Sequence, residues 1–195
     1  MARIKRIIEK RIILAPPMEM PDFPCFRVDV SNSAENLIQE FLKIRPNQNW
    51  LLLADYAAQS QQQLWTAWLL SQRAFLQNRA LARSIDAEFL RYVAGTHHVS
   101  EAFRKVGIHD NHKIAWVVNL PKHQKSADEL IPDFDAEENL EAIGSLCQKL
   151  SISIIKGKPE LTIDGLKKLG IETDKINENT GDILVGLTIS TELNS

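Results

Sequence analysis

The sequence predicts an α+β fold, a two-layer sandwich in which one mixed β-sheet has helices packed mainly on one face. Apolar runs of strand length are interspersed with longer stretches of helical periodicity. These segments follow one another without the regular strand–helix alternation of a parallel α/β sheet. The 195 residues contain no internal repeat and no long linker, so we expect a single domain over residues 1–195.

The first 54 residues predict three strands and one helix. Ile4–Ala15 is rich in isoleucine and ends at a proline-rich loop, as expected of a strand. Cys25–Val30 alternates apolar and polar residues and predicts a second strand. Ser33 is a candidate N-cap for a helix over residues 34–44. Trp50–Ala54 is a continuous apolar run of strand length, which predicts a central strand.

A helical region follows. Ser60 and Gln63 have the spacing of a capping box, which opens a helix that extends to about Asn78. Asp86–Ala94 is a second helical stretch, and Gly95 can end it in the left-handed conformation. These two helices form the part of the chain on which the functional prediction depends.

The next segments are shorter. Thr96 can cap a third helix that Gly107 closes. Lys113–Leu120 predicts a strand, and the polar stretch 121–134 predicts a loop. Asp135 then caps a helix with an apolar stripe.

The last third of the chain is less clearly patterned. Ser151–Ile155 predicts a short strand, and Thr162 can cap a short helix over Ile163–Leu169. The tail Asp182–Leu193 is apolar, and its periodicity leaves strand and helix both open.

Charge is distributed unevenly. Residues 1–127 contain 17 Lys and Arg against 11 Asp and Glu, whereas residues 128–195 contain 6 against 14. A chain polarised in this way can present a basic face to a polyanion. The structural alternative is that these charges merely solvate the surface, which is the more frequent role of charge runs.

Composition also indicates the compartment. The two cysteines, Cys25 and Cys147, are too few for a disulfide framework or a four-cysteine zinc site, which favours a reducing interior. The basic start lacks an uninterrupted apolar core for a signal peptide, and no apolar run is long enough to span a bilayer. We therefore expect a cytoplasmic protein with no membrane association.

Catalytic and cofactor motifs are missing from the sequence. It contains no phosphate-binding glycine loop, no GxSxG, no HExxH and no CxxC, so we predict neither an enzyme nor a cofactor. The adjacent His97 and His98 point about 100° apart on a helix, which disfavours one shared metal. His109 and His112 flank Asp110-Asn111, where polar turn residues are expected in any case. We predict no metal site, with a histidine-based metal protein as the minor alternative.

Basic residues are concentrated in the helical region. Between residues 73 and 105 the chain has six basic residues and only three acidic ones. Arg79 and Arg83 are spaced four apart, so that two guanidinium groups suitable for phosphates would lie on one face if the turn between the helices is helical. From the residues alone, this arrangement predicts weak nucleic-acid binding. The more frequent role of such basic residues is to solvate the surface without a nucleic-acid partner. The six basic residues are Arg73, Arg79, Arg83, Arg91, Arg104 and Lys105.

The same region resembles a known family over about 50 residues. Arg73-Ala74-Phe75, Asn78, Glu88–Gly95 and Val99–Ile108 follow the pattern of the PRPK-binding protein family at the same relative spacing. That family provides the kinase-binding subunit of the KEOPS/EKC complex. The pattern is long and therefore specific, although most of its residues form helix faces and glycine caps.

The resemblance implies a non-catalytic subunit. Family members bind and activate the small kinase/ATPase of the KEOPS complex. They also bind the 3′ CCA end of tRNA during threonylcarbamoyl-adenosine modification. For kinase binding the apolar tail residues Leu184 and Leu187 are the candidates. For tRNA the candidates are Arg73, Arg79, Arg83, Arg91, His97, His98 and Lys105.

The chain departs from the family pattern in one important place. His97-His98-Val99 stands where the family has Arg-Gln-Ile, and an unperturbed histidine is mostly uncharged at neutral pH. The family's His-Leu near the start of the first helix is replaced by Gln63-Leu64. An adaptor that binds protein but has lost RNA contact is therefore the main alternative.

Overall fold

The computed structural model describes residues 21–33, 36–126 and 129–193. The expected strand Ile4–Ala15 and the expected helix start at Ala34 lie outside these ranges. The strands are β1 (Cys25–Asp29), β2 (Trp50–Ala54), β3 (Ile114–Asn119), β4 (Lys122–Ser126), β5 (Glu129–Asp133) and β6 (Ser153–Ile154). The helices are α2 (Leu37–Ile44), α3 (Gln61–Leu76), α4 (Ile85–Ala94), α5 (Val99–Val106), α6 (Ala136–Leu150), α7 (Ile163–Lys168), α8 (Thr180–Leu193) and the 3-10 helix η1 (Asp55–Ala57).

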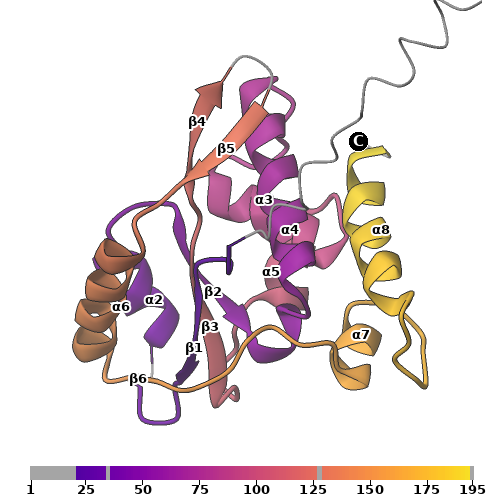
Figure 1. Ribbon diagram of the computed structural model, residues 1–195. Helices are drawn as coiled ribbons and strands as arrows, with labels where there is room; N and C mark the ends of the chain where they lie inside the picture. The colour runs from indigo at the N-terminus through magenta and orange to yellow at the C-terminus, as the bar shows by residue number, and fades with distance from the viewer. Residues whose placement is uncertain (1–20, 34–35, 127–128, 194–195) are drawn as a thin grey trace, which may run out of the picture.

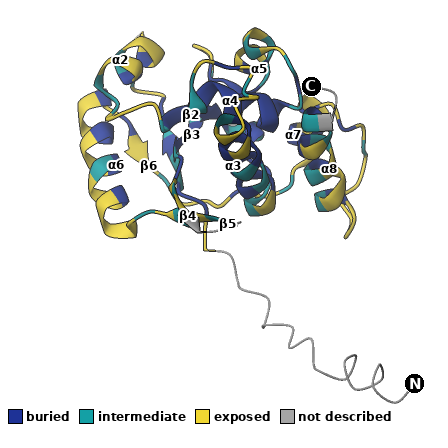
Figure 2. Cartoon of the chain, turned by 90° about the horizontal axis from the view of Figure 1, so that it is seen from above, coloured by how far each residue is buried: buried dark blue, intermediate teal, exposed yellow. Residues whose placement is uncertain are grey.

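The elements are arranged in three layers (Figure 1). A sheet of order β2-β3-β1-β6 lies in the middle, with α2 and α6 on one face and α3, α4, α5, α7 and α8 on the other. Side chains alternate along each strand. In β3, Trp116 and Val118 therefore join the core beneath the larger helical layer, whereas Ala115 and Val117 join the core beneath α2 and α6. Figure 2 shows the buried residues gathered between these layers.

The α+β class is confirmed, and the helices pack mainly on one face of the sheet as expected. Two details differ from the prediction. The strand pairs described are all antiparallel, so the main sheet is not mixed. The pair α2 and α6 also adds a second helical layer. Hydrophobic periodicity predicts which face of an element is buried but does not indicate which side of the sheet it covers.

The run Trp50–Ala54 forms β2, but this strand lies at an edge of the sheet, so the expectation of a central position is wrong. All five of its residues are buried because helices cover both faces. Arg45, which follows α2, also donates to the carbonyl of Trp50 and to Asp86 in α4, at 2.7 and 2.5 Å. An edge strand can therefore be fully apolar when side chains and helices enclose it.

Two segments form structure that the sequence left undefined. The stretch expected as a loop, 121–134, contains the β4–β5 hairpin, which pairs Lys122 with Asp133 and Gln124 with Ile131. Its strands are largely polar, so no apolar alternation marks them. The undecided tail is the helix α8, and none of the helices in the described part of the chain is long and apolar enough to cross a membrane.

The predicted caps are mostly confirmed. Ser60 accepts a hydrogen bond from the Gln63 amide at 3.1 Å, while the Gln63 side chain accepts one from the Gln59 amide rather than from Ser60. Asp135 and Thr162 cap α6 and α7 as expected. Ser33 and Thr96 are not caps as predicted, because Asn36 is the N-cap of α2 and His98 is the N-cap of α5.

Candidate functional site, an arginine loop beside the C-terminal helix

The connection between α3 and α4 holds two of the predicted basic residues, Arg79 and Arg83, and we call residues 77–84 the arginine loop. It begins with a Schellman-type turn, in which Asn78 adopts φ +53° and the Arg79 amide donates to the Ala74 carbonyl at 2.8 Å. Asparagine tolerates the left-handed conformation better than most residues. The turn ends α3 and directs the chain back toward α4, with the exposed Arg79 and Arg83 on the loop.

A buried carboxylate holds the arginine loop in place. One oxygen of Glu88, in α4, accepts hydrogen bonds from the amides of Leu81 and Ala82 at 3.1 and 2.8 Å. Its other oxygen is 2.5 Å from a guanidinium nitrogen of Arg91. Both side chains of this pair are 1% exposed. The pair therefore fixes the backbone that carries Arg79 and Arg83.

Arg91 was predicted to contact tRNA, and its burial argues for a different role. Its Nε donates to the His97 carbonyl at 3.1 Å, in addition to the ion pair with Glu88. A phosphate outside the protein would have to disrupt this pair to reach the guanidinium. We therefore assign Arg91 to positioning the arginine loop. The sequence signal for this role is Glu88, an acidic residue three positions before Arg91 on the same helix, with which Arg91 can pair.

Lys105 also has a structural role. Its ammonium donates to the carbonyls of Ala94 and Leu169, at 2.8 and 2.9 Å, and so joins the ends of α4 and α7 to α5. Burial lowers the pKa of Lys105, with a smaller opposing effect from Glu101. The two carbonyls act as acceptors in place of an external anion.

The two histidines lie between α4 and α5. His98 is exposed at the N-cap of α5, and its amide donates to the Thr96 hydroxyl at 3.3 Å. The Thr96 hydroxyl in turn donates to Glu101 at 2.5 Å, which lowers the pKa of that carboxyl. His97 is half-buried, and its carbonyl is the acceptor for Arg91. His98 is thus the more accessible of the pair.

The arginine loop meets the C-terminal helix at an ion-pair cluster. Glu192 of α8 is 2.9 Å from Arg79 and 3.9 Å from Arg73, which lies near the end of α3. The arginine side chains are 54% and 45% exposed, whereas Glu192 is only 18% exposed. Figure 1 shows α8 beside α3 and α4, which places the two predicted functional regions next to each other.

The two tail leucines face the protein interior. Leu184 is fully buried in the core beneath the larger helical layer, and Leu187 packs at its edge. A Cβ added at Gly95 would lie 2.9 Å from Cγ of Leu187, so the end of α4 and α8 are in close contact. The exposed apolar residues of α8 are instead Ile183 and Ile189.

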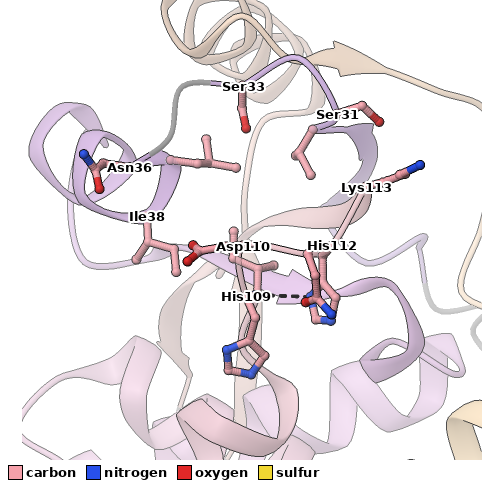
Figure 3. Close-up of a pocket in the computed structure, with 12 residues that line it drawn as sticks. Ser31, Ser33, Asn36, Ile38, His109, Asp110, His112 and Lys113 are labelled. Atoms are coloured by element: carbon pink, nitrogen blue, oxygen red, sulfur yellow. Dashed lines mark hydrogen bonds between the residues drawn. The ribbon is translucent and has the colours of Figure 1, made fainter.

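The turn His109–His112 lines a cavity of about 680 Å³ at the end of β1 and α2 (Figure 3). The His112 amide donates to the His109 carbonyl, and Nδ1 of His112 accepts from the His109 amide at 3.2 Å. Figure 3 shows the Asp110 carboxylate and the two imidazole rings pointing in different directions. Among the described residues no group of three or more His, Cys, Asp or Glu could hold a metal ion. The polar turn accounts for these residues.

Comparison with known proteins places the chain in a family. Residues 28–178 match the family model described as kinase binding protein CGI-121, which covers more than half of the chain. The match begins within β1, extends through α7 with the arginine loop, and ends before α8. No match was found among curated proteins. The match agrees with the resemblance in the helical region, and the chain belongs to the CGI-121 family of kinase-binding proteins.

Proposed function

We propose that this protein is a non-catalytic subunit of a cytoplasmic KEOPS complex. In this role it binds and activates the small kinase/ATPase of the complex and holds the 3′ CCA end of tRNA during threonylcarbamoyl-adenosine modification. Membership of a kinase-binding family is the observation that carries the proposal. The arginine loop beside α8 supports the RNA part, because it offers exposed guanidinium groups on a rigid backbone.

We place the kinase-docking surface on the outer face of α8, formed by Ile183, Gly186 and Ile189. Both isoleucines are exposed, and large exposed apolar side chains on one face favour a protein contact. A Cβ added at Gly186 would have no atom within 4 Å, so a partner element can approach the bare backbone there. Leu184 and Leu187, the original candidates, contribute from inside by fixing the position of α8.

A glycine substitution tests this surface without disturbing the core. Gly186→Arg should abolish co-purification with the kinase, because the new side chain fills the approach to α8. The isolated variant should melt at or slightly above the wild-type temperature, since nothing in the chain obstructs the side chain and arginine favours a helix more than glycine does. Gly144→Arg in α6 is the matched control, because Gly144 is also an exposed helix-interior glycine with no atom within 4 Å. Retained kinase binding by Gly186→Arg would place the docking surface elsewhere.

The proposed RNA surface consists of Arg73, Arg79 and Arg83, whereas the exposed His98 lies beyond the other end of α4. A single-stranded CCA end would be bound by cations on its phosphates and by polar contacts to its bases. Arg79→Glu combined with Arg83→Glu should weaken tRNA binding, and the wild-type affinity should fall steeply as salt is added. Removal of the CCA end from the tRNA should have a comparable effect. Affinity that is indifferent to salt would contradict a phosphate-binding surface.

An adaptor without RNA binding is the second candidate. The ion pairs of Glu192 with Arg73 and Arg79, together with the internal roles of Arg91 and Lys105, favour it. Capture of the tagged protein from its own cell extract, followed by identification of proteins and small RNAs, separates the two candidates. Recovery of the kinase without tRNA would favour the adaptor.

A further inference from the structure

The ion-pair cluster of Arg73, Arg79 and Glu192 has the arrangement of an occupied anion site. The two guanidinium groups come from the end of α3 and from the arginine loop, and each faces one oxygen of the same carboxylate. Arg79 is held from a second side by Gln77, whose side-chain oxygen accepts from Nε at 2.9 Å. A carboxylate and a phosphate are both bound by guanidinium groups through paired oxygens. One phosphate group could therefore take the place of the Glu192 carboxylate.

We infer that Arg73 and Arg79 form a binding site for a single phosphate group of the RNA, and that Glu192 is its internal competitor. This inference rests on the proposed RNA-binding function. In the free protein the Glu192 carboxylate occupies the site. On RNA binding a phosphate displaces it, and the two arginine side chains exchange one anionic partner for another.

The exposure of the three side chains indicates that the exchange is feasible. The arginines are about half exposed, so a phosphate can approach them from solvent while Glu192 contacts them from the protein side. Ion pairs at this exposure are weak in water. A competitor of this strength should weaken RNA binding by roughly three- to tenfold.

Other charged groups around the cluster do not replace Glu192. Glu88 of α4 is a buried carboxylate that contacts the arginine loop, but Arg91 and two loop amides already surround it. Tyr92 in α4 lies close enough to Glu192 and Arg79 for both to affect its pKa, which is raised mainly by burial. Glu192 is thus the carboxylate that meets both exposed arginines.

The test is Glu192→Gln, which removes the charge and keeps the shape of the side chain. We would measure binding of a fluorescently labelled full-length tRNA to the full chain by anisotropy at several salt concentrations. The variant should bind about three- to tenfold tighter, and its affinity should fall more steeply with salt by no more than about one unit of log–log slope, because one phosphate is involved. Glu178→Gln is the matched control, because Glu178 is exposed in the segment before α8 and its loss changes the net charge equally.

A double-mutant cycle connects the effect to the arginines. In a chain that also contains Arg73→Gln and Arg79→Gln, Glu192→Gln should no longer tighten binding. If the wild type binds tRNA and Glu192→Gln binds it no more tightly, Glu192 is not an internal competitor. The proposed RNA-binding function would still stand. If Glu178→Gln tightens tRNA binding as much as Glu192→Gln does, the effect comes from net charge alone, and the inference is overturned. Absence of tRNA binding in both wild type and Glu192→Gln would overturn the RNA function itself.

Discussion

Glu88 is almost completely buried, and three donors surround its carboxylate: the amides of Leu81 and Ala82 and the guanidinium of Arg91. Burial of an ionised carboxylate is tolerated only when such partners replace the lost water. The cluster is therefore a positioning device for the exposed Arg79 and Arg83. The exposed arginines of the proposed RNA surface thus depend for their position on Arg91, which is buried and pairs with Glu88.

Arg91→Met should lower the free energy of unfolding by about 3–5 kcal/mol, because it leaves the Glu88 carboxylate buried without its cation. Urea denaturation followed by circular dichroism measures the change. Arg83→Met is the control, since Arg83 is exposed and its loss should change the free energy of unfolding by no more than about 0.5 kcal/mol. An Arg91→Met variant as stable as the wild type would show that the buried pair does not support the loop.

The spacing of residues in the sequence could predict that the helical region is basic, but it could not predict the role of each basic residue. Arg79, Arg91 and Lys105 look equivalent in the sequence, because all three occur in or next to helical segments among apolar residues. Tertiary contacts separate them: Arg79 remains exposed, Arg91 pairs with Glu88, and Lys105 binds two carbonyls. Which basic residue is buried depends on the packing of α4 against α3, α5 and α8, which one sequence does not specify.

His112 provides a pH-dependent test at the same scale. Burial, followed by the nearby His109 and Lys168, lowers the pKa of His112 below its usual value of 6.5. Below that value the unfolded chain takes up the proton more readily than the folded chain, so stability should fall as the pH is lowered from 7.5 toward 5.5. Protonation of Nδ1 would also remove the acceptor for the His109 amide.

Thermal denaturation across this pH range measures the effect. His112→Asn keeps a side-chain acceptor near the His109 amide but does not titrate, so its acid destabilisation should be smaller than that of the wild type. An equal loss of stability in both proteins would assign the pH dependence to other groups.

At the scale of single elements, α8 is held by a close contact with the end of α4. Gly95 adopts φ +67°, and its α-carbon region faces Leu187 so closely that a Cβ would meet the leucine side chain. The glycine therefore satisfies two requirements, the left-handed turn that ends α4 and the space for α8.

Gly95→Ala should destabilise the protein by at least about 1–2 kcal/mol from the left-handed backbone alone, with a further cost from the collision with Leu187. Leu187→Ala should relieve the collision, so the double variant should be more stable than the sum of the two single effects predicts. Gly186→Ala is the opposite control, since an open helix-interior glycine replaced by alanine should stabilise α8 by about 0.5–1 kcal/mol. Additive effects at residues 95 and 187 would contradict a close contact.

The same scale explains which elements could be predicted. Helices with a cap and a clear apolar stripe, such as α3 and α6, are recognisable because both signals are local. The β4–β5 hairpin was missed because its strands are mostly polar, and α8 was undecided because apolar residues occur around much of its circumference. The edge position of β2 depends on strand order, which is a property of the whole sheet.

For the whole molecule, the sheet separates two cores of different size. The smaller core lies beneath α2 and α6, and the larger lies beneath α3, α4, α5, α7 and α8. Leu184 joins α8 to the larger core, which also contains Phe89, Trp65 and Trp116. The proposed kinase-docking surface and the arginine loop both belong to this larger helical layer, so their geometry depends on one continuous set of buried contacts.

Leu184→Ala should therefore lower the stability of the molecule, and any weakening of partner binding should follow from that loss of stability. The loss of a fully buried leucine should cost about 2–5 kcal/mol, depending on how far the neighbouring side chains close the cavity. For a chain of this length each kcal/mol should lower the Tm by about 2–4 °C. Gly186→Arg should behave in the opposite way, with a Tm no lower than that of the wild type and no kinase binding. Calorimetry and a kinase pull-down on the same two preparations measure both properties. A Leu184→Ala protein that has the wild-type Tm but does not bind the kinase would show that Leu184 contacts the kinase directly.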